Sequence, residues 1–276
     1  MEQIETQNQI PNSKFKLEEV GITNLKTLLV INRNGEMFRL IPTIKVTINL
    51  PSQIKGAHMS RIVESIQEIL NSELHTHRSV EAMALETLCR LAERHAYDRA
   101  EISLRFDFAL PQKTPISKKM TIEVYEIEVK TERIRVAKNN FKFTHWIGVS
   151  SKGNTVCPHA LINNKGKTHI QRAIGKLTIK GSYDEMPEFE TLIDFVERSF
   201  SSRTYSLLKT ADENQVVNQM FNNPYFVEDV CRNILNIAYS EFHGRYDLEI
   251  FAKVISEESI HKHDVIACGQ TVTKAR

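Results

Sequence analysis

The sequence predicts an α+β protein that contains two tandem copies of one unit, each with antiparallel strands and two helices on one face. Segments with strand-like alternation and segments with helical spacing follow the order strand–strand–helix–helix–strand–strand. That order occurs twice within the 276 residues. Residues 1–15 are rich in Gln, Asn and Glu without a period, which is typical of a flexible arm. We therefore expect a first repeat over residues 16–137 and a second over 138–276.

The elements of the first repeat follow from hydrophobic spacing. Ile44, Val46 and Ile48 alternate with polar residues, as they would along a half-buried strand. Ile62 and Ile66 recur at helical spacing. Ser79 precedes the next helical stretch and is a suitable N-cap. The expected elements are strands 25–31 and 41–50, helices 58–74 and 80–95, and strands 100–109 and 121–130, before a linker near 137–140.

The second repeat shows the same order of elements. Its long helical stretch contains Asn222-Asn223-Pro224, and we expect the helix to break there because proline cannot donate a backbone hydrogen bond. The expected elements are strands 141–149 and 170–179, helices 188–200 and 213–242, and strands 246–255 and 263–272.

Composition excludes several classes of function. The net charge is +2, and the basic residues are dispersed rather than gathered into a stripe, so we expect no nucleic-acid partner. No apolar run approaches the length of a membrane span, and the polar N-terminus lacks a signal-peptide core, so we expect no membrane partner and a cytoplasmic location. The four cysteines are scattered, which is typical of free thiols in a reducing compartment.

Candidate metal ligands lie in the second half of the chain. Cys157 falls in an expected loop over 153–167, and His169 begins the next expected strand, so thiolate and imidazole could reach one ion. The plainer alternative, a buried cysteine beside a surface histidine, stays open. Asp212-Glu213 could supply a carboxylate, although acids also favour the first turn of a helix for electrostatic reasons.

Candidate substrate and proton-transfer groups lie further along the chain. Glu228-Asp229 is expected mid-helix, where one carboxylate could accept two hydrogen bonds from a guanine, or where both could simply be solvated. His261 and His263 flank Lys262 beside Glu258, a set suited to proton transfer near neutral pH. Alternation would direct both histidines to one face, whereas the alternative is an ordinary polar hairpin.

Five motifs in this order resemble those of the type IB GTP cyclohydrolases, which include the archaeal Fe(II)-dependent enzymes of methanopterin biosynthesis. The resemblance covers nearly the whole chain, and the "KGxHMSR" match is highly specific. The matching segments are Val20-Gly21-Ile22-Thr23-Asn24-Leu25, Leu50-Pro51 with Lys55-Gly56-Ala57-His58-Met59-Ser60-Arg61, Leu207-Leu208-Lys209 with Asp212-Glu213, Asn223-Pro224-Tyr225-Phe226-Val227-Glu228-Asp229, and Glu258-Ser259-Ile260-His261-Lys262-His263-Asp264.

The resemblance implies the tunnelling fold (T-fold), with two copies per chain, and a homo-oligomer, dimer or tetramer, with sites at subunit interfaces. It also implies one divalent metal per site, Fe(II) or Zn(II), with Mn(II) also suited. By motif position, the implied roles are metal ligation by Cys157, His169 and Glu213, purine anchoring by Glu228, acid–base catalysis by His261 and His263, and a place near the substrate triphosphate for Arg61.

The implied reaction hydrolyses GTP. Hydroxide generated at the metal attacks guanine C8, the ring opens and formate leaves. The product is a 7,8-dihydroneopterin phosphate, either the triphosphate or the 2′,3′-cyclic phosphate, and the reaction is an early step of folate or methanopterin biosynthesis.

Three positions depart from the family pattern. His159 replaces the second cysteine of Cys-Pro-Cys, Ile170 replaces the asparagine of His-Asn-Gln-Arg, and Thr210 replaces the arginine before Asp-Glu. The missing second thiol bears on metal preference. It also leaves open the alternative of a non-catalytic or divergent T-fold homologue that binds a purine or pterin.

Overall fold

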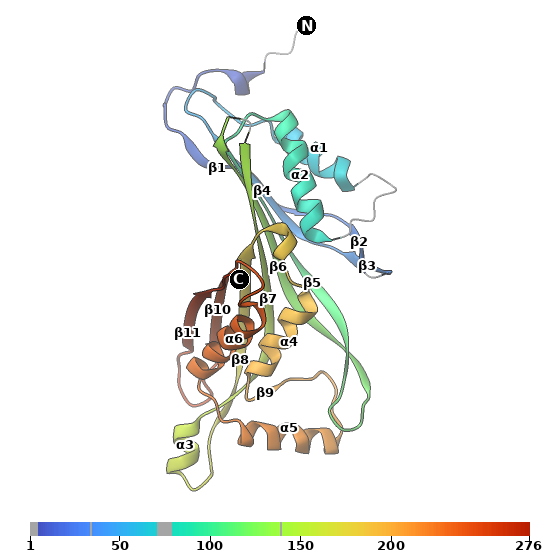
Figure 1. Ribbon diagram of the computed structural model, residues 1–276, viewed down its shortest axis with the longest axis vertical. Coiled ribbons are helices and arrows are strands. Elements are labelled where there is room, and N and C mark those ends of the chain that lie inside the picture. Colours follow the sequence, from blue (N-terminus) through green and yellow to red (C-terminus); the bar gives the residue numbers. More distant parts are fainter. Residues whose placement is uncertain (1–4, 34, 71–78, 139) are drawn as a thin grey trace. The chain divides into compact units, whose positions relative to one another are not determined.

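In the computed structural model, which describes residues 5–33, 35–70, 79–138 and 140–276, the chain forms two compact units (Figure 1). The first comprises residues 1–106 and 128–146, and the second comprises 107–127 and 147–276. Three long strands contribute residues to both units: β5 (Arg99–Lys113), β6 (Met120–Ala137) and β7 (Asn140–Val156).

The first unit combines an antiparallel sheet with two helices. Strand β4 pairs with β1 on one side and with β5 on the other. The β1–β4 pairing contains two register shifts. Helices α1 and α2 pack together through the buried Ile62, Ile66, Leu88 and Leu91. Besides its parts of β5–β7, this unit contains η1 (Thr6–Asn8), β1 (Leu17–Lys26), β2 (Leu29–Arg33), β3 (Glu36–Leu40), β4 (Thr43–Leu50), α1 (Met59–Leu70) and α2 (Val80–Arg94).

The second unit has the same kind of architecture with additional helices. Strand β8 pairs antiparallel with β10, and β10 pairs with β11. The short β9 pairs with β7. Besides its parts of β5–β7, this unit contains α3 (Pro158–Asn163), β8 (Ile170–Gly181), η2 (Tyr183–Glu185), α4 (Phe189–Ser199), β9 (Ser202–Arg203), α5 (Thr210–Asn222), α6 (Val227–Phe242), β10 (Glu249–Ser256) and β11 (Val265–Val272).

The core of the second unit lies between its sheet and the helices α4 and α6 (Figure 1). A Cβ built on Gly175 of β8 would meet Val196 of α4 at 3.0 Å and Ile234 of α6 at 3.3 Å. Both side chains are buried. The close approach of two helices over this strand explains why a small residue suits position 175.

The predicted fold class is confirmed: the structure is α+β, with antiparallel strands. The predicted order of elements omitted the β2–β3 hairpin, the helix α3 between β7 and β8, and the short β9. The expected break near Pro224 is confirmed, since α5 ends at Asn222 and α6 begins at Val227. The Ser79 hydroxyl caps α2 by accepting a hydrogen bond from Ala82 N at 3.1 Å.

Several predicted boundaries were wrong. The segment 25–31 contains the end of β1 and the start of a separate β2–β3 hairpin, not one strand. The long helix begins at Thr210 rather than residue 213. The expected loop over 153–167 contains the end of β7 and the helix α3, because Pro158 is favourable in a first helical turn. Residues 1–4 of the expected arm, residues 71–74 of the expected first helix and residue 139 of the expected linker lie outside the described residues.

Candidate active site

Two connecting segments leave the second unit's sheet at the same edge. Strand β7 ends at Val156 and β8 begins at Ile170, while β10 ends at Ser256 and β11 begins at Val265. Because these neighbouring strands alternate in direction, the segments 157–169 and 257–264 emerge together. Backbone hydrogen bonds from Cys157 N to His169 O at 3.3 Å and from Glu257 N to Arg172 O at 2.9 Å fix both segments to this edge.

Cys157 is the N-cap residue of α3. Its Sγ accepts a hydrogen bond from Ala160 N at 3.4 Å, and its carbonyl accepts one from Thr168 Oγ1 at 2.7 Å. The side chain is half-buried, so the sulfur is neither sealed in the core nor free to rotate in solvent. The interpretation of Cys157 as a fully buried small residue is therefore wrong.

His169 lies directly before β8 and is half-buried. Its Nδ1 is 2.9 Å from Gln171 Oε1. With Nδ1–H donating to that amide oxygen, the neutral ring carries its lone pair on Nε2, which is the form that binds metals.

Helix α5 brings Glu213 to the same region of the unit. The helix packs through Val216 and Met220 against Val156 and Ile170, the residues next to Cys157 and His169. Glu213 lies one turn before Val216 and is exposed. The helix that carries the predicted carboxylate therefore contacts the two strand ends that carry the predicted thiolate and imidazole.

Asp212, the neighbour of Glu213, has a different role. It is fully buried and accepts four hydrogen bonds: from Ile116 N and Ser117 N at 2.8 Å, from Ser117 Oγ at 2.6 Å and from Lys209 N at 3.0 Å. Burial would raise the pKa of this carboxyl, but these donors outweigh it and hold the pKa well below its ordinary value. Asp212 thus attaches the start of α5 to the β5–β6 turn as a permanent anion.

The three predicted ligands have the donor types of a catalytic site for a divalent ion: one thiolate, one imidazole and one carboxylate. Within the described parts of the chain, no three His, Cys, Asp or Glu side chains lie close enough together to hold a metal ion. The assignment of Cys157, His169 and Glu213 as ligands stays a prediction, supported by their donor chemistry and by the packing of α5.

The histidine pair lies in the exposed loop between β10 and β11. The rings of His261 and His263 stack with centroids 5.2 Å apart and an interplanar angle of 19°, as expected for side chains on one face. The loop begins at a chain of polar contacts. Thr155 Oγ1 lies 3.3 Å from Ser256 Oγ, which donates to Glu258 Oε1 at 2.9 Å. Both hydroxyl residues are fully buried, so this chain links the end of β7 to the loop.

The other two predicted residues belong to different units. Glu228 lies in the first turn of α6 and is exposed, so the expectation of a mid-helix position was wrong: the helix restarts at Val227 after the Pro224 break. Its neighbour Asp229 accepts a hydrogen bond from Phe226 N at 3.1 Å and caps the helix. Arg61 belongs to the first unit, where it pairs with Glu5 at 2.9 Å.

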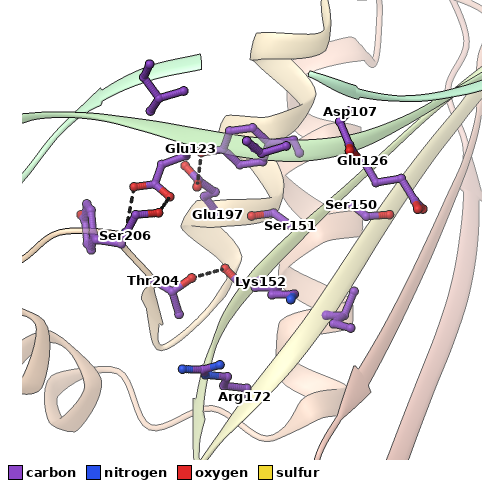
Figure 2. A pocket seen from close by; sticks show the side chains of 15 residues that line it. Asp107, Glu123, Glu126, Ser150, Ser151, Lys152, Arg172, Glu197, Thr204 and Ser206 are labelled. Atoms are coloured by element: carbon purple, nitrogen blue, oxygen red, sulfur yellow. Dashed lines mark hydrogen bonds between the residues drawn. The ribbon is translucent and has the colours of Figure 1, made fainter. Parts of the chain in front are cut away.

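Sequence reasoning missed a pocket of about 570 Å³ in the second unit (Figure 2). Arg172, three residues after His169, and Tyr205, which packs beside α5, both line it and connect it to the region of the predicted ligands. Figure 2 shows Glu123 bound to Ser206, whose N and Oγ donate at 2.9 and 2.6 Å. The lining residues are Asp107, Ile122, Glu123, Val124, Tyr125, Glu126, Ser150, Ser151, Lys152, Arg172, Ile174, Glu197, Thr204, Tyr205 and Ser206.

A buried acid forms part of the pocket wall. Glu197 accepts a hydrogen bond from Tyr125 Oη at 2.8 Å and forms an ion pair with Arg203 at 3.2 Å. Burial raises the pKa of Glu197 although Arg203 and Tyr125 oppose the shift, and burial together with the Glu197 charge raises the pKa of Tyr125. A signal for this acid exists in the sequence, since helical spacing places Glu197 on the apolar face with Ile193 and Phe200.

Comparisons with known proteins agree with the motifs. A sequence model of the family described as type I GTP cyclohydrolase folE2 matches residues 4–267. The chain is 48% identical to a GTP cyclohydrolase MptA of Pyrococcus abyssi and 46% identical to one of Thermococcus kodakarensis, in both cases over 96% of this chain and 98% of the relative. No helix in the described part of the chain has the length and apolar character needed to cross a membrane.

Solved structures identify the fold. Uricase from Arthrobacter globiformis matches with a TM-score of 0.59 over 94% of both chains, although only 8% of residues are identical. Such low identity shows the shared fold alone, which is the T-fold. The family match over most of the chain and the high identity to named relatives lead to one conclusion: this chain belongs to the type I GTP cyclohydrolase folE2 family, a family of hydrolases.

Proposed function

We propose that this chain is a metal-dependent GTP cyclohydrolase that opens the guanine ring at C8, releases formate and forms a 7,8-dihydroneopterin phosphate. The observation that carries the proposal is the family match joined to the common sheet edge that carries Cys157, His169 and the histidine loop. The relatives named GTP cyclohydrolase MptA favour a place early in methanopterin biosynthesis.

Cys157, His169 and Glu213 would hold a divalent ion, Fe(II), Zn(II) or Mn(II). When bound, such an ion supplies Lewis acidity that makes water a nucleophile near neutral pH. The hydrogen bond of Gln171 to His169 Nδ1 orients the ring so that Nε2 is the ligating atom. The half-buried Cys157 and exposed Glu213 leave both donors accessible.

The remaining residues bind the substrate and move protons. Glu228 would accept hydrogen bonds from N1–H and the 2-amino group of guanine, a charge-assisted bidentate contact. His261 or His263 would protonate the ring nitrogen that leaves C8 as the imidazole opens, and their stacking keeps both rings on one face of the loop. Arg61 would contact the triphosphate. We also propose a homo-oligomer with sites at subunit interfaces, as the family resemblance implies.

An anaerobic assay of formate release from GTP tests the activity. The metal-free protein is assayed before and after addition of Fe(II), Zn(II) or Mn(II), and metal content is measured in parallel. Cys157→Ala should lose both bound metal and formate release. The matched control Cys268→Ala, which removes an exposed cysteine of the same unit, should retain both.

Two outcomes contradict parts of the proposal. Full metal content and formate release in Cys157→Ala would refute the ligand assignment. GTP or pterin binding without formate under every metal would support the non-catalytic homologue, for which His159 in place of a second thiol is the supporting observation.

Glu228→Ala tests recognition of the base. We expect a large rise in KM for GTP, because the bidentate contact is lost. Glu241→Ala, at an exposed acid of the same helix that pairs with Arg245, is the matched control. Unchanged kinetics for Glu228→Ala would remove it from the site.

A further inference from the structure

Two lysines lie directly opposite each other on neighbouring strands of the second unit's sheet. Lys253 of β10 pairs with Lys176 of β8 in the antiparallel register. Directly opposed residues of antiparallel strands have Cβ atoms about 4.5–5.5 Å apart, and like charges at this spacing are destabilising. The fold therefore brings two ammonium groups together, an arrangement that a bound anion would relieve.

These lysines lie on the face of the sheet opposite to helix α6. A Cβ built on Gly175 of β8 or on Gly269 of β11 would meet side chains of α6. Lys176 follows the first glycine, Cys268 precedes the second, and Lys253 lies directly opposite both Lys176 and Cys268. Because successive side chains of a strand point to opposite faces, the two lysines and Cys268 share the face away from α6.

A pocket of about 520 Å³ lies over the lysine pair, and we call it the lysine pocket. In the next row of side chains, Phe251 of β10 lies directly opposite both Thr178 and Gln270. Side chains two residues apart on a strand are about 7 Å apart. The pocket thus combines an aromatic ring, flanked by a hydroxyl and an amide, with two ammonium groups one row further. Its lining includes Lys176, Thr178, Phe251, Lys253, Cys268 and Gln270.

We propose that the lysine pocket binds a small aromatic anion, with the ligand's ring on Phe251 and its phosphate or carboxylate group between Lys176 and Lys253. An anion between two like charges is attracted by both and offsets their mutual repulsion. The ammonium groups donate charge-assisted hydrogen bonds to its oxygens. The Phe251 ring offers a face for offset stacking, and the Thr178 hydroxyl and Gln270 amide can bond to polar atoms at the edge of the ligand's ring.

The lysine pocket is separate from the candidate active site. Lys176 lies seven residues after His169, which corresponds to roughly 23 Å along an extended strand. Ser256, from which the histidine loop starts, is fully buried, and its position three residues after Lys253 places it on the opposite face of the sheet. The inference therefore does not depend on GTP hydrolysis or on a metal ion.

Three cysteines allow one experiment to report on three places. Cys268 lines the lysine pocket, Cys157 is the predicted metal ligand, and Cys89 is exposed on α2 of the first unit. Metal-free, full-length protein is alkylated with iodoacetamide, and the rate at each cysteine is measured by mass spectrometry of its peptide. Phenyl phosphate at about 5 mM should slow alkylation of Cys268 about sixfold, as expected for a Kd on the order of 1 mM, and leave Cys89 unchanged.

Smaller and altered ligands test the two halves of the pocket. Inorganic phosphate and phenol, each with half of the ligand's groups, should slow alkylation of Cys268 less than about twofold at the same concentration. Benzoate separates the two kinds of anion. Protection by benzoate as well as by phenyl phosphate would assign the pocket to both carboxylates and phosphates, and protection by phenyl phosphate alone would assign it to phosphates.

Lysine variants test the anion contact, with each rate compared with the same variant's rate without ligand. Lys253→Gln should lose the protection of Cys268. The matched control Lys180→Gln, at a lysine of the same face that pairs with Glu249 at 2.8 Å, should retain it. Lys253→Gln should also have a thermal midpoint equal to or above that of the wild type, because it removes the repulsion.

Three results would overturn the proposal. The first is equal protection of Cys268 in Lys253→Gln and the wild type. The second is protection of Cys157 but not of Cys268, which would place phenyl phosphate at the candidate active site instead. The third is a lower thermal midpoint of Lys253→Gln, which would show that the two lysines stabilise the sheet rather than repel each other.

Discussion

Asp212 and Glu197 are both buried acids of the second unit, yet their pKa values move in opposite directions. Asp212 accepts four hydrogen bonds, three of them from backbone N–H groups, and its pKa is lowered. Glu197 accepts one hydrogen bond from Tyr125 and one ion pair from Arg203, and its pKa is raised by burial. For Asp212 the hydrogen-bond donors outweigh burial, whereas for Glu197 burial outweighs Arg203 and Tyr125.

The difference matches the position of each acid. Asp212 holds the start of α5, and with it Glu213, against the β5–β6 turn, a task that needs a fixed charge. Glu197 lines the pocket, where a carboxyl that protonates more readily can change its charge when a ligand enters. We infer that one acid serves structure and the other makes the pocket sensitive to protonation.

The largest effect should come from removing the Asp212 carboxylate. Asp212→Ala leaves the Ile116, Ser117 and Lys209 donors without their acceptor, and we expect a thermal midpoint roughly 5–10 °C lower. Asp212→Asn keeps one acceptor oxygen and should lose less. A midpoint equal to that of Glu213→Ala, which removes the exposed neighbouring acid, would show that Asp212 does not hold α5 to the β5–β6 turn.

The pH dependence of the Asp212 contribution has a definite sign. The folded pKa lies below the unfolded one, so the stabilisation is present above the unfolded pKa and is lost as the pH falls through the folded pKa. Urea unfolding of wild type and Asp212→Asn should therefore converge only in strong acid. Equal unfolding free energies of the two proteins near neutral pH would contradict the conclusion that Asp212 stays ionised.

His145 of the first unit extends the comparison to a base. It is fully buried, its Nδ1 lies 2.9 Å from Thr131 Oγ1, and burial lowers its pKa to about 4. The unfolded chain then binds an additional proton between the two pKa values, so stability should fall by up to about 3 kcal/mol as the pH falls from 6.5 to 4. In urea unfolding, the free energy of unfolding of His145→Gln should depend less on pH over this range than that of the wild type. The control His243→Gln, at an exposed site, should show the pH dependence of the wild type.

Glu197→Gln should produce a smaller effect of opposite sign. Because the folded pKa of Glu197 is raised, its contribution is present below the unfolded pKa and is lost as the pH rises through the folded pKa. The glutamine variant should therefore lose less stability than the wild type as the pH rises from 4 towards 7. A steeper loss in the variant would show that Arg203 outweighs burial.

Local pattern predicted much of the fold because its signals lie within a few residues of one another. The Ser79 cap joins residues three apart, and Pro224 acts on its own helix. The β2–β3 hairpin was missed because each strand has only five residues, too few for a clear alternation. Strand β6 was predicted too short because its last residues, 134–137, are exposed and lose the alternation of burial. The missed end of β7 does alternate in burial, but residues 150–155 are polar or glycine and so give no apolar alternation in the sequence.

The sequence predicted those site residues that belong to motifs, but not those that only tertiary contacts bring together. Periodicity says nothing about Asp212 and Ser117, which are 95 residues apart, or about Tyr125 and Glu197, which are 72 apart. From their position in the sequence alone, Asp212 and Glu213 were equally good candidates for a functional carboxylate. Only the β5–β6 turn, which contacts the first and leaves the second exposed, separates their roles.

The smallest effect on stability should come from the hydroxyl contacts at the sheet edge. Ser256→Ala removes the hydroxyl that contacts both Thr155 and Glu258, and the loss of these two hydrogen bonds should cost about 1–2 kcal/mol in urea unfolding. Glu258 then loses its attachment at the base of the loop that carries His261 and His263. A loosened loop should lower kcat for formate release roughly tenfold, because proton transfer depends on position.

The control separates position from stability. Ser259→Ala, at an exposed position of the same loop, should leave both kcat and stability unchanged. KM for GTP should change little in Ser256→Ala, since Glu228 and Arg61 are untouched. If Ser256→Ala loses stability but keeps kcat, the buried hydroxyls serve the sheet alone and the histidines are held by other contacts. The Thr155 and Ser256 hydroxyls would then have no effect on catalysis.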